Sequence, residues 1–342
     1  MSIHKLTSTN AFVAFDLEDA PAAGIVRSAP KILQGGATDL ARSLTYAFAT
    51  LEMKRGGASA GINAKPDERA DAIAAFVSEV TPMAADGGLV LDAAKGVPAE
   101  ALAPLQAVDG RSELAASDHG ADTLATHLAG LGPVTSAATV TGGLDGKQVA
   151  IEGFGAAGPA LAEAAAAQGA TVVAIATTAG AEIDADGLDP TALRERWVEH
   201  GDAMVGDDAD PAWEIFGVTA DVLFAGSKMG AINHETAGKL GASAVVPHAP
   251  LPFTARALAV MQRAEVIAVP DFVSTAAPLL AMWAETEATA DAVIAAAGDT
   301  VKRVIDEAAE HSDGLFLGAC HRAETFLRSW RDELPFGRPL AS

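Results

Sequence analysis

The stretch that decides the fold runs from Gln148 to Ala176 and reads QVAIEGFGAAGPALAEAAAAQGATVVAIA. Its first five residues form an apolar run of strand length, and its last six, Thr171–Ala176, form another. Between them lie a glycine-rich turn and an alanine-rich segment that begins with Pro159, at a helix position where a missing N–H costs nothing. The order strand, glycine turn, helix, strand is that of a βαβ unit that binds the pyrophosphate of a dinucleotide.

The turn carries the complete pattern G-x-G-x-x-G. In this pattern the first glycine permits the tight turn, the second lets the main chain approach the pyrophosphate, and the third lets the helix pack closely. The predicted cofactor residues of the turn are Gly153, Phe154, Gly155, Ala156, Ala157 and Gly158. The sequence therefore predicts NAD or NADP as the cofactor; the alternative is a glycine turn that holds no ligand.

An acidic residue at the end of the second strand would hold the ribose 2′-OH of NAD. Thr177 and Thr178 occupy that place, and the acids Glu182 and Asp184 come several residues later. Threonine hydroxyls can bond a 2′-phosphate, although no Arg or Lys follows before Arg194. We include both threonines among the predicted cofactor residues. Because no acidic residue ends the second strand, the sequence weakly disfavours strict specificity for NAD.

Composition excludes several classes of function. The net charge of −22 and the absence of a basic cluster argue against nucleic acid as a partner. No uninterrupted apolar run reaches the roughly 18 residues that span a bilayer, and the N-terminus lacks the pattern of a signal peptide, so we expect a cytoplasmic protein without a membrane partner. Cys320 is the single cysteine, so we expect neither a disulfide framework nor a metal site.

The length of 342 residues allows two α/β domains with their own cores. We predict a substrate and oligomerisation domain at residues 1–130, a Rossmann domain at 131–285, and a helical segment at 286–342 that returns to the first domain. Strands are expected at residues 11–15, 88–91, 221–225, 244–246 and 266–269, and helices at 39–52, 67–80, 99–105, 190–200, 235–240 and 252–263. A loop entering a strand is expected at 55–62 and a turn at 184–189.

Five further segments fall in the order and spacing of one enzyme family. They are residues 21–27 (PAAGIVR), 40–46 (LARSLTY), 56–62 (GGASAGI), 245–250 (VVPHAP) and 269–271 (VPD). Over most of its length the chain thereby resembles the glutamate/leucine/phenylalanine/valine dehydrogenase family. The resemblance implies an oligomeric NAD(P)-dependent enzyme with a substrate domain, a nucleotide domain and a cleft between them.

The same resemblance places the family's catalytic groups on residues that lack them. One lysine of the family binds the substrate α-carboxylate, a second activates water or the imine, and an aspartate shuttles a proton. In this chain these positions hold Ala47, Ser59 and Ala94, and a late asparagine is replaced by Thr275. The fold is implied, but the usual base for amine chemistry is missing.

Other residues are candidates to take over these roles. Lys54 and Asp92 lie near the replaced positions, Ser59 can bond a substrate, and Arg27 can bind a carboxylate with two parallel hydrogen bonds. The remaining candidates are His248 as acid or base, Thr275 for substrate, and Ser227 and Lys228 for cofactor. For each charged residue the alternative is a solvated surface group, and for His248 it is a structural histidine.

Two functions follow from these observations. The first is an NAD(P)-dependent oxidoreductase that acts on a small-molecule C–N or C–O substrate with altered chemistry. The alternative is a catalytically inactive paralogue that serves as a nucleotide or metabolite sensor or as a scaffold subunit. Apolar pairs in the C-terminal helical region, at 315–317 and 326–327, predict a homo-oligomer in either case.

Overall fold

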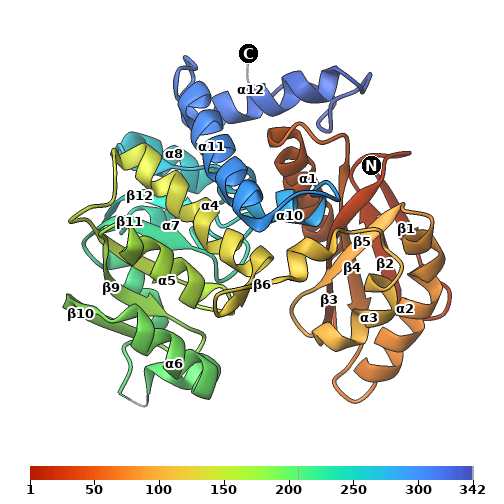
Figure 1. Ribbon diagram of the computed structural model, residues 1–342, viewed down its shortest axis with the longest axis horizontal. Coiled ribbons are helices and arrows are strands. Elements are labelled where there is room, and N and C mark those ends of the chain that lie inside the picture. The colour runs from red at the N-terminus through yellow and green to blue at the C-terminus, as the bar shows by residue number, and fades with distance from the viewer. Residues whose placement is uncertain (207, 341–342) are drawn as a thin grey trace. The chain divides into compact units, whose positions relative to one another are not determined.

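The computed structural model describes residues 1–206 and 208–340, which form two compact units, each with its own sheet (Figure 1). The first unit comprises Met1–Ser112 and Cys320–Ser342, and the second comprises Glu113–Ala319. The predicted α/β class is confirmed. The packing groups residues 113–130 and 286–319 with the second unit, so the compact units do not coincide with the domains predicted from the sequence.

The first unit is built on a five-stranded sheet of order β1-β2-β4-β3-β5. Its strands are β1 (Ser2–Lys5), β2 (Ala11–Phe15), β3 (Ala22–Ala29), β4 (Gly56–Asn63) and β5 (Leu89–Ala93). Strands β3, β4 and β5 run parallel, whereas β2 is antiparallel to β1 and β4. The carboxyl ends of β3, β4 and β5 therefore share one edge.

The predicted loop entering a strand at residues 55–62 proves to be almost entirely strand, because β4 pairs with β3 from Gly56 onward and with β2 from Ala58 onward. Small residues permit this pairing under a helix. A Cβ added to Gly57 would lie 1.7 Å from the carbonyl oxygen of Ala41 in helix α1 (Gln34–Thr50). The glycines that suggested a loop instead allow α1 to approach the strand.

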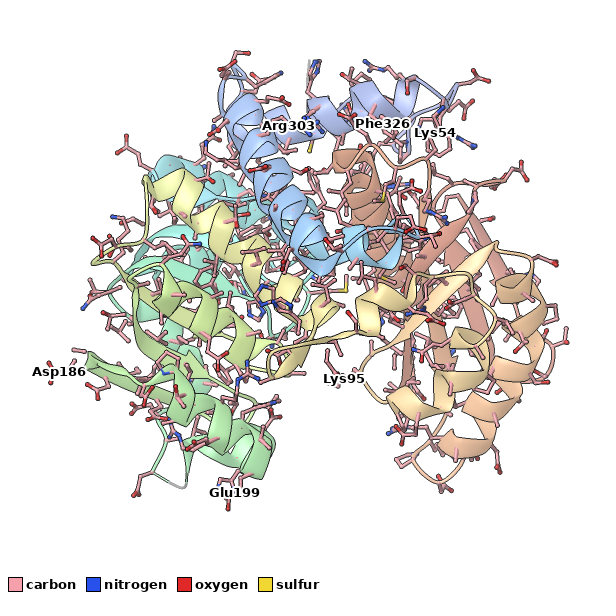
Figure 2. All side chains as sticks on the ribbon, viewed as in Figure 1. Lys54, Lys95, Asp186, Glu199, Arg303 and Phe326 are labelled. Carbon is pink, nitrogen blue, oxygen red and sulfur yellow. The ribbon has the colours of Figure 1, made fainter. Side chains whose placement is uncertain are left out.

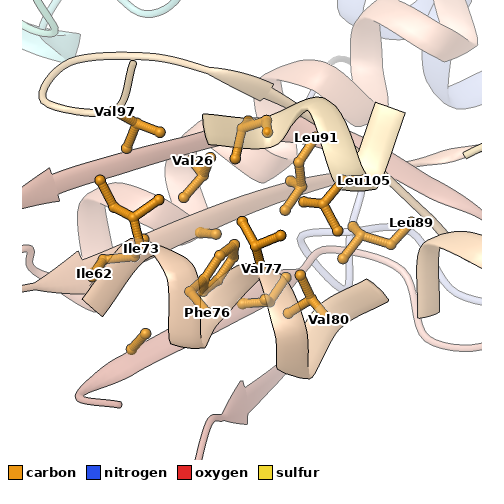
Figure 3. Packing of buried hydrophobic residues seen from close by; sticks show 14 of the residues in the cluster. Val26, Ile62, Ile73, Phe76, Val77, Val80, Leu89, Leu91, Val97 and Leu105 are labelled. Carbon is orange, nitrogen blue, oxygen red and sulfur yellow. The ribbon is translucent and has the colours of Figure 1, made fainter. Parts of the chain in front are cut away.

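Opposite faces of this sheet carry different side chains, since successive residues of a strand alternate. One face packs on helix α2 (Arg69–Ala85), together with η1 (Ala99–Leu102) and α3 (Ala103–Gln106), around an apolar core. Figure 3 shows this core with the labelled residues Val26, Ile62, Ile73, Phe76, Val77, Val80, Leu89, Leu91, Val97 and Leu105. We call the other side the α1 face, because α1 covers it at Gly57.

The second unit contains a six-stranded sheet of order β10-β9-β8-β11-β12-β13. Its strands are β8 (Gln148–Glu152), β9 (Thr171–Ala176), β10 (Ala181–Leu188), β11 (Ala220–Ala225), β12 (Ala242–Pro247) and β13 (Ile267–Ala268). All are parallel except β10, which is antiparallel to β9. From β8 the chain adds β9 and β10 on one side of the sheet and then β11, β12 and β13 on the other side. The direction in which strands are added therefore reverses between β8 and β11, and this position is the switch point of a doubly wound sheet.

The predicted turn at 184–189 is wrong, because these residues lie in or directly after β10. The strand is exposed at residues 183–186, and its register is irregular between Ile183 and Leu188. An edge strand has a partner on one side alone, so it tolerates a polar sequence without apolar alternation.

Helices surround the second sheet (Figure 1). They are α4 (Leu124–Thr141), α5 (Gly158–Ala167), α6 (Pro190–His200), α7 (His234–Ala237), α8 (Ala255–Arg263), α9 (Asp271–Ser274), α10 (Ala277–Met282) and α11 (Ala290–Ala309). A short hairpin, β6 (Asp118–His119) and β7 (Asp122–Thr123), precedes α4. Gly130 of α4 lets α5 approach, because a Cβ there would lie 2.7 Å from the main chain of Ala160. None of the helices in residues 1–206 and 208–340 combines the length and apolarity needed to cross a membrane.

The C-terminal segment returns to the first unit from Cys320 onward, within helix α12 (Leu315–Arg328). The Tyr46 hydroxyl donates a 2.8 Å hydrogen bond to Glu324, and Arg322 donates to the carbonyl oxygen of Thr50 at 2.9 Å. Helix α11, by contrast, packs on α4 within the second unit. The predicted return is therefore correct for the last helix and wrong for the one before it.

Candidate functional site

The three glycines of the turn between β8 and α5 have different surroundings. Gly153 has a φ of +84°, and a Cβ added to it would lie 2.3 Å from the Ser227 nitrogen. At Gly158 an added Cβ would lie 2.8 Å from the Phe154 ring. At Gly155 it would meet nothing nearer than the Gly153 carbonyl oxygen at 3.7 Å. The first and third glycines accommodate protein atoms, and the space at the second fits a pyrophosphate.

Phe154 contributes to the core and not to a ligand surface. Its ring is 1% exposed and stands edge-on to Trp197, with the ring centroids 6.0 Å apart. Its N–H donates to the carbonyl oxygen of Ala176 at 2.7 Å. Of the predicted cofactor residues, Phe154 can therefore offer a ligand little beyond the shape of its main chain.

The end of β9 holds a carboxylate that does not come from the strand. Thr177 is buried and donates its hydroxyl to the carbonyl oxygen of Asp202 at 2.7 Å. The exposed Thr178 hydroxyl donates to the Asp202 carboxylate. Both predicted threonines are thereby engaged with Asp202, which lies in the 3-10 helix η3 (Gly201–Val205). Sequence reasoning missed this residue, because no local signal links it to a strand that ended 26 positions earlier.

At the neighbouring end of β11, Ser227 and Lys228 are exposed beside the glycine turn, as the contact between Gly153 and Ser227 requires. The buried Glu152 carboxylate accepts the N–H groups of Gly226 and Ser227 at 3.0 and 3.1 Å. The structure thus brings Ser227 to the turn by way of Glu152, a residue that the sequence analysis did not select.

His248 occupies a structural position at the same edge. Its Nε2 lies 2.8 Å from the carbonyl oxygen of Glu152, so Nε2 carries the proton that it donates. A Cβ on Gly226 would lie 2.4 Å from the imidazole ring. Burial lowers the pKa of His248, which favours the neutral ring. This geometry makes His248 a link between strand ends, and its role as an acid or base stays a prediction.

In the first unit, Arg27 and Ser59 share the α1 face. Val26 and Ala60 point into the α2 core, so their neighbours Arg27 and Ser59 point to the opposite face. Ser59 pairs with Ile25 in the register and Arg27 with Gly61, which makes the two side chains diagonal neighbours.

The polar atoms of these two residues lack partners. Arg27 Nε and Nη2 and Ser59 Oγ are buried without a hydrogen-bond partner in the part of the chain that the structure describes. Burial lowers the pKa of Arg27, although a guanidinium stays charged near neutral pH. Buried polar groups are nearly always bonded in folded proteins, so these donors indicate a missing acceptor.

The other sequence-predicted residues are not brought to this place. Lys54 is exposed two residues before β4 begins, so it lies about five residues, or ~16 Å along the strand, from Ser59. Figure 2 labels it at one end of the first unit and Lys95, which follows β5, at another. Asp92 pairs with Arg111 at 2.5 Å, and Arg111 also binds the buried Asp109. Neither Lys54 nor Asp92 is placed to act as the missing base.

The other positions at which the resemblance places the family's catalytic or substrate-binding groups also carry no basic side chain. Ala47 is buried in α1, and Ala94 follows β5. Thr275, in the second unit, donates its hydroxyl to the carbonyl oxygen of Asp271 at 2.7 Å. In residues 1–206 and 208–340, no three His, Cys, Asp or Glu side chains are arranged to hold a metal ion.

The reversed strand order and the glycine turn at the carboxyl ends of β8 and β9 define a dinucleotide-binding protein of the Rossmann class. Residues 124–316, more than half of the chain, match the family model described as Glutamate/Leucine/Phenylalanine/Valine dehydrogenase. The chain belongs to this family, and it is an oxidoreductase of the amino-acid dehydrogenase type that uses NAD or NADP.

Relatives agree with this assignment. The chain is 26% identical over 296 residues to the NADP-specific glutamate dehydrogenase A1 of Halobacterium salinarum, covering 77% of this chain and 68% of that one. It is 31% identical over 134 residues to the NAD-specific glutamate dehydrogenase of Staphylococcus aureus strain COL, covering 39% of this chain and 32% of that one.

Solved structures share the fold. The hetero-hexameric glutamate dehydrogenase of Thermus thermophilus superposes with a TM-score of 0.77 at 24% identity, covering 93% of this chain and 84% of the other. The L-tryptophan dehydrogenase of Nostoc punctiforme has a TM-score of 0.64 at 20% identity, covering 96% and 95%.

Proposed function

We propose that this chain catalyses hydride transfer between NAD(P) and a small carboxylate-bearing substrate, an amino acid, oxo acid or imine, with Arg27 as the carboxylate anchor. The observation that carries the proposal is the pair of buried Arg27 nitrogens without a partner in the described structure. A guanidinium binds a carboxylate through two parallel hydrogen bonds, and leaving it unpaired is costly. Ser59 Oγ, on the same face, is available for a further hydrogen bond to the substrate.

The cofactor side of the proposal rests on the second unit. The turn at Gly155 leaves room for the pyrophosphate, and Ser227 and Lys228 are exposed beside it. The bound nicotinamide supplies or accepts the hydride. The protein's part is to hold the two reactants in place.

We further propose that the chemistry at the substrate differs from that of glutamate dehydrogenases. Ala47, Ser59 and Ala94 offer no ammonium or carboxylate at the positions where the resemblance places the family's catalytic groups. Lys54 lies at the wrong end of β4, and Asp92 is paired with Arg111. Activation of water or ammonia therefore has no side-chain base among these positions, and turnover of glutamate at family rates is not expected.

Purified protein should be incubated with NAD or NADP and a panel of amino acids, and with NADH or NADPH and a panel of oxo acids with ammonium and of small imines. Absorbance of the reduced cofactor reports turnover. The expected result is turnover of a carboxylate substrate other than glutamate or a branched-chain amino acid. Efficient turnover of either of those would contradict altered chemistry, because the missing groups would then be dispensable.

An inactive paralogue is the alternative outcome of the same experiment. Cofactor binding without turnover of any substrate, together with copurification with an active homologue or a transcriptional regulator, would favour it. Measurable turnover by wild type that falls in Arg27→Met would exclude the inactive paralogue.

We also propose that the chain assembles into at least a homodimer. Leu315, Phe316 and Leu317 at the start of α12 are only half-buried in the single chain, which leaves apolar surface for a second copy. Light scattering at salt high enough to screen the acidic surface should give at least twice the chain mass of 34.5 kDa. A mass of one chain under those conditions would contradict the proposal.

A further inference from the structure

The carboxylate at the end of β9 has a defined position because two consecutive side chains hold it. Thr177 donates to the Asp202 main chain at 2.7 Å and also accepts the N–H of Ala179 at 3.1 Å. Thr178 donates to Asp202 Oδ2. Asp202 Oδ1 has no hydrogen-bond partner in the part of the chain that the structure describes, and the residue is exposed. The end of the second Rossmann strand thus presents a carboxylate oxygen to solvent.

This is the place where a dinucleotide's adenosine ribose lies in a Rossmann unit, and its charge decides which cofactor fits. A 2′-hydroxyl donates a hydrogen bond to a carboxylate, whereas a 2′-phosphate is repelled by it and needs a cation. Residues 148–227 contain two arginines and no lysine, and the next lysine, Lys228, follows β11, which lies two strands away from β9 in the sheet.

Both arginines are already paired. Arg194 binds Asp122 at 2.7 Å and Glu163 at 2.5 Å. Arg196 binds Glu182 at 2.8 Å and also reaches the Met204 carbonyl oxygen. Neither guanidinium can turn to a phosphate without giving up an ion pair, so neither arginine is available to offset the charge of Asp202.

We propose that Asp202, held by Thr177 and Thr178, selects NAD over NADP by accepting the ribose 2′-hydroxyl and repelling a 2′-phosphate. This rests on the proposed function, since it assumes that the glycine turn binds the cofactor. It reverses the prediction from the sequence, which disfavoured strict NAD specificity because Thr177 and Thr178 were the polar residues found at the strand end. The threonines orient the acid and do not replace it.

The test is a fluorescence titration of the purified protein with NADH and with NADPH, at the lowest salt that keeps the far-UV circular dichroism of the folded state. Wild type should bind NADH at least about tenfold more tightly than NADPH, a ratio equivalent to ~1.4 kcal/mol. Asp202→Asn should bring the two dissociation constants to within about threefold, mainly by tightening NADPH. Thr178→Val should narrow the ratio less, because Thr177 still holds the Asp202 main chain.

Asp186→Asn is the matched control. It removes one exposed negative charge from β10 of the same unit, far along the strand from the Ala181 end that pairs with Ala176 (Figure 2). The NADH to NADPH ratio should stay as in wild type.

Two results would overturn the assignment of Asp202: equal or tighter binding of NADPH by wild type, or an unchanged ratio in Asp202→Asn. Both leave the proposed function standing, because the protein still binds a dinucleotide. Failure of folded wild type to bind either dinucleotide would overturn the proposed function and this inference together.

Discussion

The glycine turn of the second unit and the α1 face of the first sheet are prepared for a ligand in opposite ways. At Gly155 the protein leaves out a side chain, and an added Cβ would meet no protein atom within 3.4 Å. At Arg27 and Ser59 the protein places polar atoms in buried positions and gives them no partner in the described residues. The turn should therefore cost the folded protein little, whereas the α1 face should cost it stability until a ligand binds.

This difference separates two kinds of mutation. At Gly155 of the turn, adding atoms should remove binding and leave stability alone. At the α1 face, removing polar atoms should remove function and increase stability. The four predictions that follow test this separation, from the largest expected effect to the smallest.

Gly155→Val should weaken NADH binding at least about 100-fold, or ~2.7 kcal/mol, because the side chain fills the space of the pyrophosphate. Gly155 does not have a positive φ, so valine should not strain the backbone. Urea unfolding should give a free energy within about 0.5 kcal/mol of wild type.

Gly153→Ala is the control for that substitution. A φ of +84° and a Cβ 2.3 Å from the Ser227 nitrogen should lower the free energy of unfolding by about 3 kcal/mol. Equal losses of stability in both variants would show that the turn as a whole is structural.

Arg27→Met should raise KM for the carboxylate substrate found in the panel by about 50-fold or more, since both hydrogen bonds of the anchor are lost. The free energy of unfolding should stay equal or rise by about 1 kcal/mol, because an apolar side chain replaces buried donors without partners. Arg27→Lys keeps the charge but loses the paired donors, so its KM should lie between that of wild type and that of Arg27→Met. An unchanged KM with reduced stability would mean that Arg27 is purely structural.

Ser59→Ala should raise the free energy of unfolding by about 1 kcal/mol, since it removes a fully buried hydroxyl that has no hydrogen-bond partner in residues 1–206 and 208–340. Turnover should fall about tenfold while the dissociation constant of NADH stays the same, because Ser59 lies in the first unit and the turn in the second. Differential scanning calorimetry and steady-state kinetics measure the two effects. Loss of stability in this variant would mean that the hydroxyl bonds within the protein.

The smallest predicted effect is that of His248 on the pH dependence of the free energy of unfolding. Burial lowers the pKa of His248 from its ordinary value of 6.5, so below that pH the unfolded chain binds more protons than the folded one. Stability should therefore fall as the pH drops through about 6.5 toward 5. Urea unfolding at several pH values should show a shallower decline for His248→Gln, which cannot titrate. An identical decline, together with loss of turnover, would return His248 to the role of acid or base.

Local patterns predicted those elements whose two faces are both buried. The apolar runs at 148–152, 171–176 and 221–225 became β8, β9 and β11 within one residue of the prediction, because strands covered on both faces read as continuous apolar segments. Strand β10 was missed because it lies at an edge and carries exposed acids. The start of β4 was predicted as a loop leading into a strand, because its small residues match a loop until the packing of α1 is known.

What the sequence determined by itself is the dinucleotide-binding unit, since turn, helix and both strands lie within 29 consecutive residues. The roles that we propose for Asp202, Arg27 and His248 depend on contacts that only the tertiary structure decided. Asp202 meets Thr178 across 24 residues, and His248 meets Glu152 across 96. Arg27 is distinguished by two buried nitrogens that have no hydrogen-bond partner among the described residues, which no spacing in a sequence records. Local sequence specifies the backbone conformation, whereas the environment of a polar side chain depends on which distant segments the fold packs around it.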